Sequence, residues 1–196
     1  MHGGTYEDLS PDRKAYVTKN AVKSAVLLAC SPIALLILYE RLTSTVYSNT
    51  NMIRLAGQVY SACDIVGSVR LAGRMPSSTK MHHAMVAGFS VLNLTLDYND
   101  WSNPFSNLAV VAATSCLSYS VNYYLSLRKV VAHRDSRLPA VVGTITYLPT
   151  FIFSLIFHAC TVDATTWQGA MFTALLLPIW YDDAVLLRHL AQRVLE

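Results

Sequence analysis

The sequence has little charge. Charged residues make up only 14% of its 196 residues, whereas hydrophobic residues make up 53%, and soluble domains carry roughly 25% charged residues. A soluble protein needs polar side chains to cover its apolar core, and this chain has too few of them. The mean hydropathy of +0.36 agrees with that conclusion. The composition therefore predicts an integral membrane protein, and the length is that of a single domain.

Several motifs that carry chemistry are also missing. The four cysteines stand singly in separate apolar segments, so neither a zinc site nor a redox motif is indicated. The sequence has no glycine-rich phosphate loop and no Ser-His-Asp order, and we expect no metal and no cofactor. Its basic residues form short clusters beside apolar segments, which gives no case for binding nucleic acid. The N-terminus has no secretory signal, and its acidic residues do not fit a mitochondrial presequence.

Six apolar segments are each close to the ~20 residues that a helix needs to cross hydrocarbon. The predicted fold is therefore an all-α, polytopic membrane protein with six transmembrane helices at about 21–42, 51–71, 80–98, 105–127, 138–162 and 166–190. This prediction divides the chain into an N-terminal interfacial segment (1–20), a six-span transmembrane domain (21–190) and a C-terminal tail (191–196). Ser10-Pro11-Asp12 has the residues of a helix start, so a helix is expected to run from Pro11 into the first span.

The positions of the basic residues predict how the six helices are oriented across the membrane. Six spans place both termini on one side, and thirteen of the fifteen Lys and Arg residues, Lys19 and Lys23 among them, then lie on that side. The other side holds only Arg41 and Arg54. This bias is a positive-inside signal. Both termini are thus predicted to face the inner side of a membrane, either the mitochondrial inner membrane or the endoplasmic reticulum.

Polar side chains on four predicted helices fall at a similar depth, in the half of the membrane beside the basic face. Asp64, for example, lies six residues before Arg70, which is ~9 Å along a helix. A carboxylate at that depth costs roughly 2.5–3.5 kcal/mol on insertion scales. We therefore expect these groups to share one interior, with His–Asp pairing between the third helix and the second or sixth. The members are Asp64, His82, His83, Asn122, Tyr123, Asp182 and Asp183, and Asn93 is expected to line the same cavity.

These residues also have structural explanations. A histidine near a helix end is often interfacial, and Asp182 and Asp183 could pair with Arg188. A metal site is not indicated by His82 and His83, because adjacent residues on a helix diverge by ~100° whereas zinc-binding helices use an i, i+4 pair.

The segment CDIVGSVRLAGRMPSSTKMHHAMVAGF resembles the centre of the TLC-domain proteins, the ceramide-synthase-like membrane family. In that family a helix bearing an aspartate leads through a short basic loop to a histidine pair, and Asp64, His82 and His83 occupy the matching positions. FSNLAVVAATSCLSYSVNYYLSLRKV and LLLPIWYDDAVLLRHL are similar to later family segments. The resemblance covers 22–190 and implies a six-helix barrel around a lipid-sized cavity. In acyl-transferring members the histidines would act as general base, with the carboxylate orienting them.

The chain departs from those members, because it lacks the HDxxD-type segment that follows their histidine pair. A weaker resemblance to fatty-acid elongases lacks the upstream histidine, near 78–79. We therefore expect a protein that binds or handles membrane lipid without full acyltransferase chemistry; any activity would be acyl transfer to a lipid or amine. Two alternatives remain open. One is a non-catalytic accessory subunit of a larger membrane complex, for example a mitochondrial respiratory or ATP-synthase complex. The other is a small transporter with a proton relay.

Overall fold

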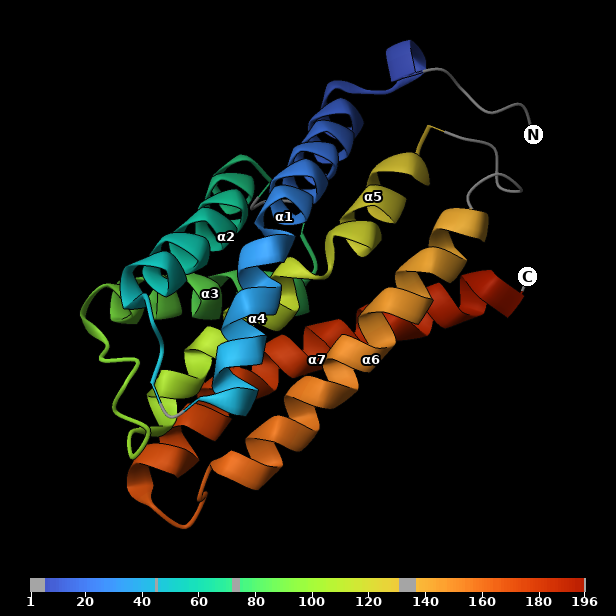
Figure 1. Ribbon diagram of the computed structural model, residues 1–196. Helices are drawn as coiled ribbons and strands as arrows, with labels where there is room; N and C mark the ends of the chain where they lie inside the picture. Colours follow the sequence, from blue (N-terminus) through green and yellow to red (C-terminus); the bar gives the residue numbers. More distant parts are fainter. Residues whose placement is uncertain (1–5, 45, 72–74, 131–136, 196) are drawn as a thin grey trace.

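The computed structural model describes residues 6–44, 46–71, 75–130 and 137–195. Within these ranges the regular structure is entirely helical, which confirms the all-α class. Short 3-10 helices at Tyr6–Asp8 and Pro104–Asn107 accompany the α-helices (Figure 1), which are α1 Pro11–Thr43, α2 Thr50–Leu71, α3 Ser77–Thr95, α4 Leu108–Cys116, α5 Tyr119–Leu127, α6 Arg137–Thr161 and α7 Trp167–Leu195.

The helix starts follow from local sequence. α1 begins at Pro11, directly after Ser10, as predicted, because proline at the first helical position loses no intrahelical hydrogen bond. The helix then continues without a break through residue 20, where the interfacial segment was expected to give way to the first span. The connection before α4 is a 3-10 helix, in which the Asn103 side chain accepts a hydrogen bond from the Phe105 backbone N–H.

The prediction of one helix over 105–127 is wrong. The segment is divided into α4 and α5 by a turn at Leu117 and Ser118. Side chains hold backbone carbonyls at this break: Asn122 donates to the Ser118 carbonyl at 3.2 Å, and Ser24 of α1 donates to the Tyr119 carbonyl at 2.8 Å. At the break itself the Ser118 hydroxyl donates to the Ser115 carbonyl at 2.6 Å, and serine side chains of this kind compete with the helix for backbone carbonyls.

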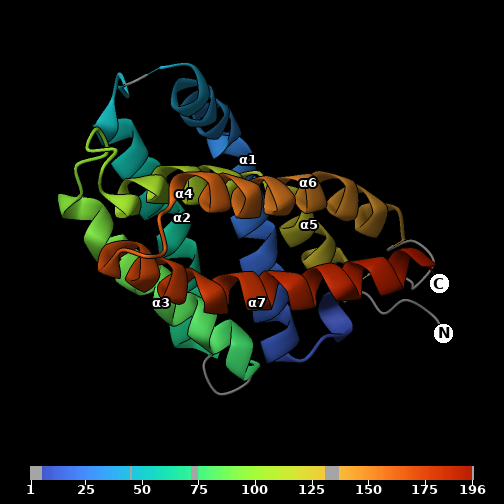
Figure 2. The same ribbon diagram turned by 90° about the horizontal axis from the view of Figure 1, so that it is seen from below.

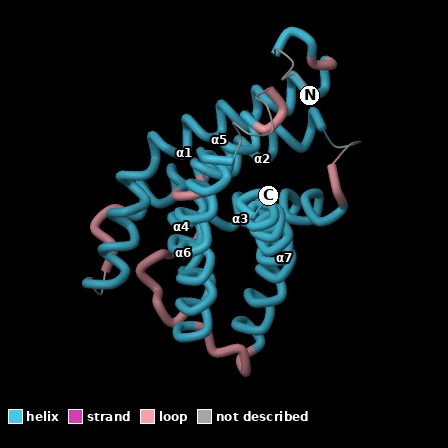
Figure 3. Tube along the Cα trace, turned by 90° about the vertical axis from the view of Figure 1, so that its right-hand side faces the viewer, coloured by secondary structure: helices cyan, strands magenta, loops and turns pink. Residues whose placement is uncertain are grey.

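α1 packs against α2, α4 and α5. α7 packs against α3 on one side and α6 on the other, and α6 and α7 run alongside each other (Figure 2). α1 crosses this α6–α7 hairpin at a steep angle (Figure 3). The start of α1, the end of α5, the start of α6 and the end of α7 lie toward one end of the bundle (Figure 1).

Two hydrophobic clusters form the core. The larger one joins α1–α4 and α7, and its centre contains Leu27, Leu176 and the ring of Phe172, all without exposed surface. The smaller one lies between α5, α6 and α7, where Val121 and Leu190 are almost fully buried. The break between α4 and α5 lies between the two clusters, because α4 contributes to the larger cluster and α5 to the smaller one.

Three of the described helices, α1, α6 and α7, are long and apolar enough to cross a membrane. Only 28%, 17% and 17% of their most apolar windows are buried inside the protein, so most of this apolar surface faces outward. α4 and α5 have nine residues each and are too short to span hydrocarbon alone. The crossing of a membrane by six spans therefore stays a prediction.

Two of the lysines counted for the predicted membrane orientation do not lie where the prediction placed them. Lys19 and Lys23 lie well inside α1, with Lys23 buried, and they do not flank the bundle. Arg74, Arg134 and the side chain of Arg70 lie outside the described residues. Placement of both termini on the inner side of a membrane stays a prediction.

Candidate functional site

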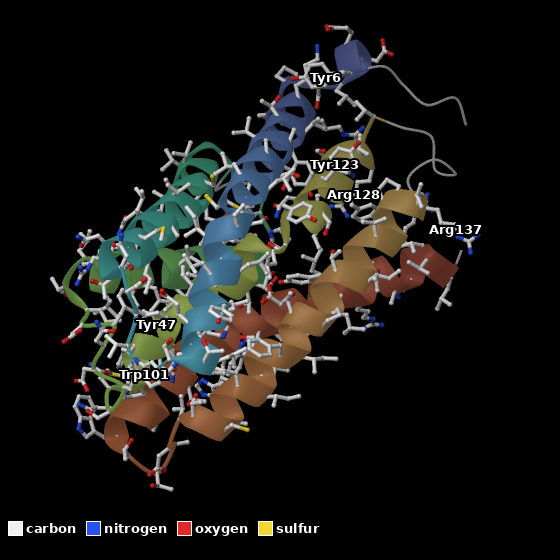
Figure 4. All side chains as sticks on the ribbon, in the orientation of Figure 1. Tyr6, Tyr47, Trp101, Tyr123, Arg128 and Arg137 are labelled. Carbon is white, nitrogen blue, oxygen red and sulfur yellow. The ribbon has the colours of Figure 1, made fainter. Side chains whose placement is uncertain are left out.

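A cavity of about 650 Å³ lies among α1, α2, α3, α5, α6 and α7, and its volume is that of a small-molecule site. Arg128, just after α5, is part of its wall and lies toward the end of the bundle where α1 begins (Figure 4). The structure brings together in this wall six of the eight residues predicted to form the site: Asp64, His82, His83, Asn122, Asp182 and Asp183.

Asp64 lies at the centre of the charged groups and has no exposed surface. Lys23 Nζ of α1 donates a 2.5 Å hydrogen bond to Asp64 Oδ1, and the same ammonium lies 4.9 Å from the centre of the Tyr60 ring. His83 Nδ1 of α3 lies 3.4 Å from the same Asp64 oxygen. One carboxylate oxygen therefore connects three helices.

A second histidine–carboxylate pair lies beside the first. His82 Nδ1 is 3.6 Å from Asp182 Oδ2 of α7, and Thr79 donates a 3.0 Å hydrogen bond to the other oxygen of Asp182. Adjacent helical residues point ~100° apart, so His82 and His83 reach different helices although their ring centres lie 5.5 Å apart. The expected His–Asp pairing is present to both the second predicted span and the sixth.

Lys19, one helical turn before Lys23, extends this cluster. Its Nζ lies 3.5 Å from His83 Nε2, the imidazole nitrogen that faces away from Asp64. The Lys19 side chain passes directly over Gly67 of α2, where an added Cβ would lie 2.2 Å from Lys19 Cε. Glycine at position 67 therefore lets the lysine reach His83.

Sequence reasoning missed both lysines, because it counted them among the charges flanking the first span. A signal was available: positions 19 and 23 are four apart and share one face of a helix already expected to start at Pro11.

Three buried polar atoms of the cluster make no hydrogen bond within the described residues: Asp64 Oδ2, His82 Nδ1 and His83 Nδ1. The two His–Asp distances fit ion pairs but are too long for good hydrogen bonds. Buried polar groups are nearly always hydrogen-bonded, so three such atoms without a partner in the described part of the chain set this cluster apart from ordinary polar packing.

The remaining wall combines polar and apolar groups. Asp183 of α7 and Tyr147 of α6 both line the cavity, and Asn122 is held by its bond to the Ser118 carbonyl. Beyond α5, burial and the neighbouring Arg128 lower the pKa of Lys129. Apolar side chains complete the lining: Val121, Leu125, Val185 and Leu186.

The other two residues predicted to line the cavity lie elsewhere. Asn93 is buried between α2 and α3, where it donates to the Arg54 carbonyl at 2.9 Å and accepts a hydrogen bond from Tyr98. It borders a separate cavity of about 40 Å³. The Tyr123 side chain is 52% exposed on α5 and is not part of the cavity wall (Figure 4).

Within the described residues, no three His, Cys, Asp or Glu side chains are arranged to hold a metal ion. The charged cluster is instead a set of proton donors and acceptors at the wall of a cavity. Such a set can orient a polar group, and it can move a proton to or from that group.

Comparison with known proteins identifies no relative: no protein-family model matches the chain, and neither a curated protein nor a solved structure does. The function must therefore be argued from the cavity and its residues.

Proposed function

We propose that this chain is a TLC-like integral membrane protein that binds a lipid inside its helix bundle, with the polar group of the lipid against Asp64, His82 and His83. The observation that carries this proposal is the cavity of about 650 Å³ with a buried charged cluster in its wall. Six membrane-spanning segments and an inner-side location of both termini are part of the proposal. A mitochondrial inner membrane or endoplasmic reticulum location is also part of it.

The lining supports an amphipathic ligand. One wall carries the two His–Asp pairs, whereas Leu125, Val185 and Leu186 present apolar surface to the same space. A ligand with one polar end and one hydrocarbon part satisfies both walls, because its polar end can lie against the polar side chains while its chain contacts the aliphatic side chains.

The same observations bear on the accessory-subunit alternative. A subunit whose polar residues serve packing alone would be expected to fill its interior with side chains and to satisfy its buried polar atoms. The open volume beside Asp64 and the unpartnered imidazole nitrogens support lipid binding instead. Recovery of the chain only in a fixed stoichiometric complex, without bound lipid, would favour the accessory role.

Filling the cavity tests the proposal. Val185 lines the cavity and is half-buried, whereas the adjacent Ala184 is exposed and does not line it, so Val185→Trp and Ala184→Trp form a matched pair. The readouts are lipid that co-purifies in mild detergent and binding of pyrene-labelled hexadecanoic acid to the reconstituted protein. We expect the wild type and Ala184→Trp to bind alike and Val185→Trp to lose most binding. Equal binding by all three proteins, or by none, would overturn the proposal.

A further inference from the structure

Lys19, His83 and Asp64 are arranged in series through opposite nitrogens of one imidazole. Lys19 Nζ lies 3.5 Å from His83 Nε2, and His83 Nδ1 lies 3.4 Å from Asp64 Oδ1. A nucleophile, a base within hydrogen-bond reach and a third group that orients the base form the general arrangement of nucleophilic catalysis. Here the group in the nucleophile position is an amine.

The two lysines of the cluster are not equivalent. Lys23 is held by Asp64 at 2.5 Å, whereas no carboxylate forms an ion pair with Lys19 among the described residues. A lysine nucleophile is activated by desolvation or by a neighbouring cation. Lys19 meets both conditions, because its side chain is half-buried and Lys23 lies one turn away on the same face of α1.

Gly67 fits this role of Lys19. The closest approach of a Cβ at position 67 would be to Cε, Nζ and Cδ of Lys19, at 2.2, 2.5 and 2.7 Å. Those atoms are the flexible end of the side chain, so a larger residue at position 67 would move the amine without forcing the helices apart. Gly67 is thus a positioning residue for the Lys19 amine.

We propose that Lys19 is a nucleophilic amine that forms a reversible imine with the carbonyl carbon of a long-chain aldehyde or ketone held in the cavity. This inference rests on the proposed function and deepens it by naming the reactive group of the lipid. A thioester or ester would instead leave Lys19 as a stable amide and block the site after one turnover. An imine is returned to free amine and carbonyl by water, so a carbonyl compound is the ligand class that this amine can bind repeatedly.

The step balances without a further reagent. The lone pair of Lys19 Nζ attacks the carbonyl carbon while the π electrons of the C=O bond move to oxygen. His83 Nε2 takes a proton from the new N–C adduct and delivers it to that oxygen, which gives a carbinolamine. A second proton, delivered in the same way, lets the hydroxyl group leave as water while the nitrogen lone pair forms the C=N bond. Asp64, whose Oδ1 lies 3.4 Å from His83 Nδ1, stabilises the charged form of the imidazole as an ion pair.

Borohydride trapping tests the inference. The reconstituted protein is incubated with hexadecanal, reduced with sodium borohydride and digested, and each lysine is then examined by mass spectrometry for a hexadecyl group. We expect the adduct on Lys19 in the wild type and equally in the control Lys14→Arg, whose lysine lies at the surface beside Glu7. Lys19→Arg should abolish it, and His83→Gln should slow its formation at least tenfold.

Gly67→Ala is a second test variant, which can be used if His83→Gln fails to fold. This variant should bind pyrene-labelled hexadecanoic acid like the wild type but form the Lys19 adduct at least tenfold more slowly, because the amine is displaced from His83. Unaltered fatty-acid binding together with no adduct, or with adduct spread over surface lysines, would overturn the inference and leave the proposed function standing. If the wild type does not bind the fatty acid, the proposed function is overturned instead.

Discussion

Lys23 of α1 and Asp64 of α2 form an ion pair with a distance of 2.5 Å between Nζ and Oδ1, in a place where Asp64 has no exposed surface. Removing one partner of a buried ion pair leaves an uncompensated charge and costs about 3–5 kcal/mol, whereas replacing both by apolar residues is often nearly neutral. We expect Lys23→Met to lower stability by that amount and Lys23→Met/Asp64→Leu to recover most of the loss. Unfolding of both single variants and the double variant in detergent gives the coupling energy. Strictly additive effects would show that the pair contributes nothing as a pair.

Gly169 and Gly88 should respond in opposite ways to alanine. At the start of α7 an added Cβ on residue 169 would lie 2.0 Å from the Asp163 carbonyl oxygen, a backbone atom that cannot move aside cheaply. Gly169→Ala should therefore lower stability by about 1–3 kcal/mol. Gly88, within α3, has nothing within 4 Å of its Cβ position, and alanine there should stabilise the helix by up to about 1 kcal/mol. Thermal unfolding of the two variants checks this, and a shift of the same sign in both would contradict it.

Arg41 should not be replaceable by lysine without loss. Its guanidinium lies 3.7 Å from the centre of the Trp101 ring and donates to Asn107 Oδ1 at 2.9 Å, so it connects α1 to the segment before α4. A planar guanidinium can stack and hydrogen-bond at once, and an ammonium cannot. We expect Arg41→Lys to cost about 1–2 kcal/mol. The control is Arg54→Lys, since a lysine there can still donate to the Leu96 carbonyl. Equal losses in the two variants would argue against a special role of stacking.

Tyr47, in the connection between α1 and α2, should make stability sensitive to alkaline pH. Burial raises the pKa of its hydroxyl from 10.0 to about 12, against an opposing effect of Arg41. Because the folded-state pKa lies above the unfolded one, the folded state holds this proton more tightly. The resulting stability is complete below the unfolded pKa and is lost as pH rises through the folded pKa.

Tyr47→Phe provides the test of this pH dependence. Tyr47 lies beside Trp101 (Figure 4), and among the described residues its buried hydroxyl has no hydrogen-bond partner, so phenylalanine should not lower stability at neutral pH. Between the two pKa values the variant should lose less stability per pH unit than the wild type. Parallel loss in both proteins would assign the alkaline sensitivity to other groups.

Much of the fold could be predicted from composition and local signals. Pro11 after Ser10 marks the start of α1, and the apolar segments place most helices within a few residues of their observed bounds. The break at Ser118 could not be predicted in this way. The apolar pattern of the segment continues across the break, and the bond of the Ser118 hydroxyl to the Ser115 carbonyl is visible only in the structure.

The candidate site could likewise be predicted from the sequence only in part. The depth of Asp64, His82 and Asp182 within their helices was sufficient to predict that they share one interior and form His–Asp pairs. Depth alone says nothing of direction around the helix axis, so Asn93 was assigned to the same cavity although it faces the contact between α2 and α3. The role of Gly67 depends on which side chain crosses it, and no property of a glycine in sequence reveals that.

The break between α4 and α5 interrupts the helix that would otherwise run from the larger hydrophobic cluster to the cavity wall. α4 belongs to the larger hydrophobic cluster, whereas α5 contributes Val121 to the smaller cluster and Leu125 to the cavity wall. A substitution that shifts α5 therefore need not be transmitted along a continuous helix into the larger cluster. Related sequences could in this way acquire cavities of different width, and hence different ligand preferences, while the α1–α4 scaffold stays the same.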